Sequence, residues 1–165
     1  MIIPNTFLRQ QLESLIHPAP GRCAHIDFDL VEQAGLTIME RRIPAVDLAH
    51  NYKCLWFVFA YMLREPWFST ASVPPDIFDN PTPFLANYGF NLVQSPSEGD
   101  VLAYVTAGEI DIQAHHFGIF QEGKVISKWG AGHIFRHSIE QVPTRYGEKV
   151  IFYAKDIKRD NRKLV

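Results

Sequence analysis

The stretch that decides the predicted fold is Ala114-His115-His116-Phe117-Gly118-Ile119-Phe120-Gln121-Glu122-Gly123-Lys124-Val125-Ile126-Ser127-Lys128-Trp129. Its central Glu122-Gly123 separates two runs that are rich in apolar residues. This spacing predicts a β-hairpin with a two-residue turn. In such a hairpin Phe120 lies opposite Val125.

The same turn decides which side chains share a face of the hairpin. Gly118 lies opposite Ser127 when the turn has two residues. Side chains alternate along a strand, so His116 and Ser127 are expected on one side, together with Trp129. Lys128 is expected on the other side.

Outward from the hairpin, the second half of the chain has the period of β structure. The strands predicted there are 90–94, 101–106, 114–121, 124–129 and 150–154. In the first half, apolar residues at helical spacing predict helices at 6–16 and 51–63, while 26–43 fits either a strand or a helix. The Pro-rich segment 66–83 is expected to be a long ordered loop, followed by a short helix at 83–87. Helices first and strands second predict an α+β fold with a helix packed on an antiparallel sheet.

Length and composition favour one domain. A chain of 165 residues with 47% hydrophobic content can bury a single sizeable core. We therefore predict one domain over 1–165, with its core at about 45–155. Residues 1–44 are expected to form a helical N-terminal extension, and 156–165 a basic tail.

The charge balance and the lengths of the apolar runs argue against nucleic-acid binding and against a membrane span. Lys and Arg number 16 against 18 Asp and Glu, so no basic field is expected to attract nucleic acid. No apolar run approaches the ~20 residues that span a bilayer, and the first residues lack the pattern of a secretory signal. A cytoplasmic location and no membrane span are the expectations, and the oligomeric state stays open.

No metal or other cofactor is expected from the sequence. There is no Cys-x-x-Cys pattern, and His115 and His116 are adjacent on a predicted strand, where alternation sends them to opposite faces. The two cysteines, Cys23 and Cys54, are expected to be thiols in a reducing compartment.

Cys54 and His116 are the candidate catalytic pair. Cys54 stands near the start of the predicted helix 51–63, where the positive end of the helix dipole favours a thiolate. A histidine on a strand can then take the thiol proton. The alternative is that Cys54 is a small buried hydrophobe among the apolar residues of the helix.

The order of these features resembles the NlpC-type papain-like cysteine peptidase superfamily. The residues that carry the resemblance are Cys54 at a helix start, then Gly99-Asp100-Val101-Leu102-Ala103-Tyr104, then His116-Phe117-Gly118-Ile119-Phe120. The chain is more similar still to an uncharacterised bacterial group with a Ser-Lys-x-Gly strand, here Ser127-Lys128-Trp129-Gly130. The resemblance covers roughly 51–153.

This resemblance implies an antiparallel half-barrel sheet against the Cys54 helix. It implies a cysteine hydrolase, either a peptidase or an amidase, or an acyltransferase acting on a small peptide, amide or acyl substrate. Cys54 would be the nucleophile, His116 the base and Ser127 the third catalytic residue, a place that Lys128 or His137 could take instead. Trp56, Trp129 and His137 are the candidate substrate-binding residues, with core packing as the alternative for Trp129.

The chain also departs from the superfamily pattern. Lys53 stands where an Asp is usual before the cysteine, and Leu55-Trp56 replace Ser-Gly. A bulky indole at Trp56 could fill the groove. A catalytically inactive papain-like domain that acts as a binding or interaction module is therefore the alternative function.

Overall fold

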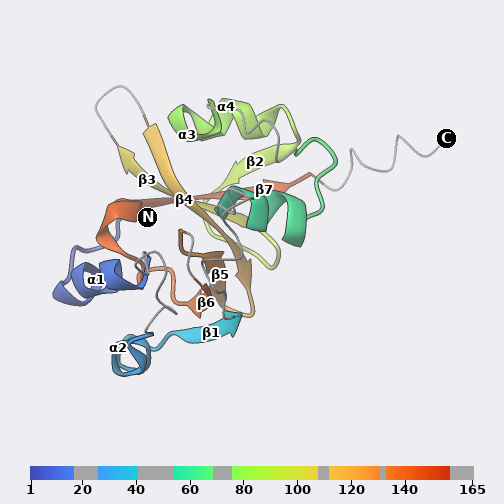
Figure 1. Ribbon diagram of the computed structural model, residues 1–165. Coiled ribbons are helices and arrows are strands. Elements are labelled where there is room, and N and C mark those ends of the chain that lie inside the picture. The colour runs from blue at the N-terminus through green and yellow to red at the C-terminus, as the bar shows by residue number, and fades with distance from the viewer. Residues whose placement is uncertain (17–25, 41–53, 69–75, 108–111, 131–132, 157–165) are drawn as a thin grey trace.

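A computed structural model of the chain describes residues 1–16, 26–40, 54–68, 76–107, 112–130 and 133–156. Within these ranges seven strands form one open sheet, and every neighbouring pair is antiparallel. The strands are β1 (Thr37–Glu40), β2 (Phe90–Val93), β3 (Val101–Ala107), β4 (Ile112–Gln121), β5 (Lys124–Lys128), β6 (Ile134–His137) and β7 (Lys149–Lys155). Their order across the sheet is β1-β6-β5-β4-β3-β7-β2 (Figure 1).

The helical segments are short. They are α1 (Phe7–Gln11), the 3-10 helix η1 (Leu12–Leu15), α2 (Phe28–Gln33), the π-helix η3 (Trp56–Met62), α3 (Asp76–Asp79), α4 (Pro81–Ala86) and the 3-10 helix η4 (Thr144–Tyr146). The Thr6 side chain accepts a hydrogen bond from the Arg9 N–H and caps α1, and Asp27 caps α2 in the same way. Short helices together with an antiparallel sheet confirm the α+β class.

Both faces of the sheet are apolar. Along β3, Leu102 and Tyr104 point to one face, while Val101, Ala103 and Val105 point to the other, and all five are fully buried. The first face packs against the N-terminal helices, and the second packs against η3, α3 and α4 (Figure 1). Each large apolar side chain that is buried in these layers stabilises the fold by about 1.5–3 kcal/mol.

The β4–β5 hairpin has the predicted register. Phe120 pairs with Val125, and the pairs on either side are Gln121 with Lys124 and Ile119 with Ile126. Both turn residues have positive φ, as a two-residue hairpin turn of this kind requires. The two strands pair only over these residues, because β4 continues along β3 while β5 continues along β6.

The helix predicted for 51–63 is helical from Cys54 to Met62 in its described part, since residues 51–53 lie outside the described ranges. Most of it is a π-helix, which ends with the Leu63 N–H donating to the Val58 carbonyl at 3.0 Å. Its buried side chains reach the sheet. The ring of Phe59 lies 6.0 Å from that of Phe117 on β4, so the helix is anchored one residue from His116.

Three other predictions about elements have clear outcomes. The helix predicted for 6–16 is confirmed as α1 followed by η1. The ambiguous segment 26–43 holds α2 and then β1, and 41–43 lies outside the described residues. The long loop predicted for 66–83 is wrong, because α3 and the start of α4 lie within it. Pro81 occupies the first turn of α4, where a missing N–H costs no helical hydrogen bond.

Candidate active site

A cleft of about 240 Å³ opens beside the point where β4 and β5 separate. It is lined by Ile16, Cys54, His115, His116, Gly130, Arg145 and Tyr146. These residues come from the end of η1, the Cys54 helix, β4, the segment after β5, and η4. The structure therefore brings Cys54 and His116, which are 62 positions apart in the sequence, to one cleft.

Cys54 is the first described residue of its helix and is 7% exposed. Its neighbour Leu55 is fully buried in the layer between the helix and the sheet. Trp56, the bulky residue two positions on, is not among the residues that line the cleft, and its indole stacks on Tyr61 with ring centroids 5.7 Å apart. The cleft is thus not filled by this indole.

An irregularity in β4 lies next to His116 and re-aims Ala114. Tyr104 pairs with His116, but the next residue of β3, Val105, pairs with Ala114, so His115 is an extra residue in β4. Ala114 and Phe117 consequently share the face toward η3, although three positions separate them. A β-bulge re-aims side chains in this way and is common beside active sites.

The His116 ring is almost completely buried and is stacked on a tyrosine. The rings of His116 and Tyr146 are nearly parallel, with an interplanar angle of 5° and centroids 3.9 Å apart. Burial lowers the pKa of His116 well below 6.5, and the neighbouring His137 lowers it further. The imidazole is therefore neutral near pH 7, which is the state that can accept a proton.

The two ring nitrogens of His116 have different surroundings. Nε2 is buried and has no hydrogen-bond partner among the described residues. His116 lines the cleft, and its other ring nitrogen, Nδ1, is the candidate for a proton transfer there. A cysteine in the same cleft can transfer its proton to that atom.

Ser127 makes its hydrogen bonds to residues other than His116. Its Oγ lies 2.8 Å from Nε2 of His137, and Trp129 Nε1–H donates to the same Oγ at 3.0 Å. Nδ1 of His137 lies 2.8 Å from the Ser138 carbonyl, which can only accept. His137 Nε2 therefore accepts from the Ser127 hydroxyl, and burial lowers the pKa of His137 to about 4.

None of the three candidate substrate-binding residues lines the cleft. Trp129 and His137 are fully buried between the sheet and the N-terminal helices. Trp56 packs against Tyr61 of its own helix. Lys128, one of the alternatives for the third catalytic residue, is also fully buried and does not line the cleft. The structure thus gives Cys54 and His116 a common site and gives the other candidates packing or hydrogen-bonding contacts elsewhere.

Tyr146 is the cleft residue that the sequence did not reveal. It lies 30 positions after His116 in a three-residue helical turn, and its 6% exposed side chain faces the cleft. Its hydroxyl is beside the Gly130 backbone but meets hydrogen-bond geometry with none of the described residues. Burial raises the pKa of Tyr146 well above 10, and nearby Cys54 raises it further. No local motif marks such a residue, because its role depends on a contact between distant segments.

A buried arginine holds the segment that carries Tyr146. Arg9 is 3% exposed, and its Nε–H donates to the Val142 carbonyl at 2.9 Å. Its Nη2 donates to the carbonyls of Gly147 at 2.6 Å and Pro143 at 3.4 Å, and Nη1 donates to Pro4 at 3.1 Å. The planar guanidinium suits this arrangement because its donors diverge in fixed directions.

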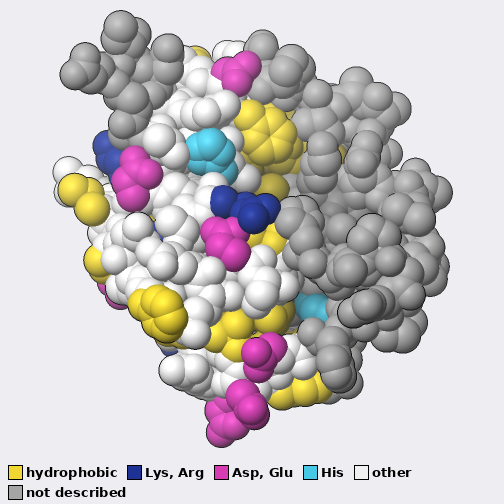
Figure 2. Space-filling model, turned by 60° about the vertical axis from the view of Figure 1, so that its left-hand side comes forward, with side chains coloured by type: hydrophobic (Ala, Val, Ile, Leu, Met, Phe, Trp, Pro, Cys, Tyr) yellow, Lys and Arg dark blue, Asp and Glu magenta, His cyan; other side chains and the backbone are white. Residues whose placement is uncertain are grey.

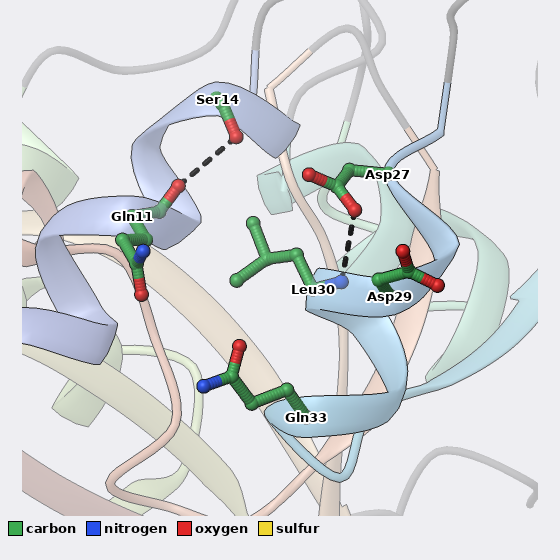
Figure 3. Close-up of a pocket in the computed structure, with 6 residues that line it drawn as sticks. All are labelled: Gln11, Ser14, Asp27, Asp29, Leu30 and Gln33. Carbon is green, nitrogen blue, oxygen red and sulfur yellow. Dashed lines mark hydrogen bonds between the residues drawn. The ribbon is translucent and has the colours of Figure 1, made fainter.

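A second pocket, of about 360 Å³, lies between η1 and α2 (Figure 3). Its lining is mainly polar and includes Gln11, Gln33 and Asp29. Asp27 turns its carboxylate to the Leu30 N–H, 2.9 Å away, so it serves as the helix cap. This pocket contains neither Cys54 nor His116.

Some other kinds of site can be assessed within the described ranges. No group of three or more His, Cys, Asp or Glu side chains there is placed to hold a metal ion. Also within those ranges, no helix combines the length and apolar character needed to cross a membrane. On the face shown in Figure 2, acidic and basic side chains are interspersed and form no continuous basic patch among the described residues.

Comparison of the chain with family models, with curated proteins and with solved structures found no match.

Proposed function

We propose that the protein is a papain-like cysteine hydrolase or acyltransferase of the NlpC type, with Cys54 as nucleophile and His116 as base. The observation that carries this proposal is the shared cleft, which is lined both by Cys54 and by a histidine whose lowered pKa keeps it neutral near pH 7. A helix against an antiparallel sheet, in the order expected for that superfamily, supports it.

The proposed reaction begins when His116 Nδ1 takes the proton of the Cys54 thiol. The sulfur then attacks the carbonyl carbon of a small peptide, amide or thioester, while the Cys54 backbone N–H helps to hold the oxyanion. His116 returns the proton to the departing amine or thiol, and an acyl-cysteine remains. Water releases the acyl group in a hydrolase, and another nucleophile accepts it in an acyltransferase.

A catalytically inactive binding module is the second candidate. It is favoured by the absence, within the described residues, of a hydrogen-bond partner for His116 Nε2 and by the commitment of the Ser127 hydroxyl to His137. A base without a fixed orientation is a poor catalyst, so this alternative makes a distinct prediction about the thiol.

The test is the alkylation rate of Cys54 with iodoacetamide at pH 6, followed by mass spectrometry of the labelled peptides. If His116 is the base, Cys54 reacts much faster than Cys23, because the imidazole can take the thiol proton as the sulfur attacks. His116→Ala should remove that difference.

The matched control is His115→Ala, which removes the adjacent histidine. Its ring is 2.9 Å from the Thr106 hydroxyl, so its loss should slow Cys54 far less. Equal rates for Cys54 and Cys23 in the wild-type protein would support the inactive module instead.

A further inference from the structure

In the part of the chain that the structure describes, His116 Nε2 lacks the hydrogen bond that commonly orients a catalytic imidazole. A general base must present one nitrogen to the nucleophile, and a hydrogen bond at the other nitrogen commonly fixes that orientation. Here Nε2 has no such partner among the described residues. The hydroxyl of Ser127, expected from the sequence to fill this place, is bonded to His137.

We propose that the aromatic ring of Tyr146 is the positioning residue of the site, holding the His116 imidazole by parallel stacking where the described residues offer Nε2 no hydrogen bond. This proposal rests on the proposed function, because it concerns the base of that reaction. It assigns the role to the ring and not to the hydroxyl.

The stacking geometry restrains the imidazole. With an interplanar angle of 5° and centroids 3.9 Å apart, any rotation of the imidazole about its Cβ–Cγ bond drives an edge into the phenol ring. The ring of Tyr104 provides a second aromatic contact, with its centroid 5.7 Å from that of the His116 ring. The face of an aromatic ring also attracts a cation, so the stack favours the imidazolium that forms when His116 takes the proton.

The Tyr146 ring is itself fixed from several sides. Arg9 binds the carbonyls of Pro143 and Gly147, which flank η4. Gly147 has φ +105°, and a Cβ there would come 2.3 Å from the Val105 carbonyl oxygen, so the segment lies directly against β3. A ring held in this way can restrain another ring.

The test compares Tyr146→Phe, which keeps the ring, with Tyr146→Leu, which removes it. The readout is the rate of Cys54 alkylation by iodoacetamide from pH 5 to pH 10, in full-length protein. Tyr146→Phe should stay within about twofold of the wild-type rate, and Tyr146→Leu should be slower by about tenfold at pH 6.5, or about 1.4 kcal/mol. Near pH 10 the Leu variant should approach the wild-type rate, because a thiol that ionises by itself needs no base.

A collapsed site would stay slow at pH 10, so the pH profile separates positioning from a general structural defect. A Phe variant as slow as the Leu variant would overturn the assignment to the ring, and a Leu variant as fast as wild type would overturn the proposal entirely. Urea unfolding checks that each variant folds, and Tyr146→Met replaces Tyr146→Leu if the latter does not.

A second measurement needs no destabilising variant. Proton NMR of the wild-type protein and Tyr146→Phe should show His116 ring protons shifted to high field by the stacked ring, and unshifted protons would contradict the stack. His116→Ala separates the two proposals. If it reacts at the wild-type rate, the base is wrong and both fail; if it is slow while Tyr146→Leu is fast, only the present inference fails.

Discussion

Single residues decide which side chains of β4 face the cleft. His116 faces Tyr104 and the cleft because side chains alternate along β4 from Phe117, while the extra residue His115 turns Ala114 back to the face that packs on η3. Two positions further on, Gly118 leaves room for the partner strand. A Cβ at this position would lie 2.5 Å from Val125 Cγ1 and 3.1 Å from Ser127 Cβ.

Gly118→Ala should therefore destabilise the protein by about 1–3 kcal/mol, the usual cost of overfilling a packed core. Val125→Ala removes the methyl groups that clash, so the double variant should be less destabilised than the two single variants together. Urea unfolding of the four proteins gives the coupling directly. If the two losses of stability were strictly additive, the Val125 side chain would not be what excludes a larger residue at position 118.

The sequence could predict part of this residue-scale picture. Hairpin alternation placed His116 and Ser127 on one side, but it carries no information about a bulge, which depends on how β3 pairs with β4. Alternation also could not reveal the hydrogen bond between the Ser127 hydroxyl and His137. His137 lies on β6, which pairs with β5, and the sequence did not indicate this strand.

At the scale of elements, strands with a clear turn signal were predictable, and the short strands β1 and β6 were not. In β6 three residues are buried, namely Ile134, Phe135 and His137, and Arg136 is half-buried. Apolar and polar residues do not alternate along this strand. β1 lies in a segment whose pattern suited a helix equally well. Both strands owe their structure to pairing with a neighbour.

The contact between α1 and the segment around η4 is another element-scale feature, and it depends on one cation. Arg9→Lys should destabilise the protein by about 2–4 kcal/mol, because a single ammonium cannot reach the four carbonyls that the guanidinium binds. Chemical denaturation measures this loss.

Arg145→Lys is the matched control for Arg9→Lys, since it lies on the same segment. Its ion pair with Glu13 is half exposed, so the control should cost no more than about 1 kcal/mol. Similar losses for the two variants would contradict a special role for the buried contact.

For the molecule as a whole, two buried histidines link stability to pH. His116 and His137 are both neutral when folded, with pKa values lowered by burial, but ionise near 6.5 in the unfolded chain. Stability should thus be complete above pH 6.5 and fall as the pH drops toward 4. His137 alone, with a pKa of about 4, accounts for a loss of about 3 kcal/mol.

Urea unfolding at pH 7, 6, 5 and 4 measures this dependence. His137→Gln should lower the free energy of unfolding at every pH. It should also make this free energy depend less on pH, because the contribution of His137 is removed. A stability that stays constant from pH 7 to pH 4 would be incompatible with neutral buried imidazoles.

β3 has a hydrogen-bonded neighbour along each edge and an apolar layer over each face. Its amides can meet solvent only when the sheet itself comes apart, so it belongs to the part of the protein that opens last. His116 lies directly opposite Tyr104 of this strand. The proposed base is thus attached to the most persistent part of the described structure, and a ligand of the proposed site would have to adapt to an imidazole whose backbone does not yield.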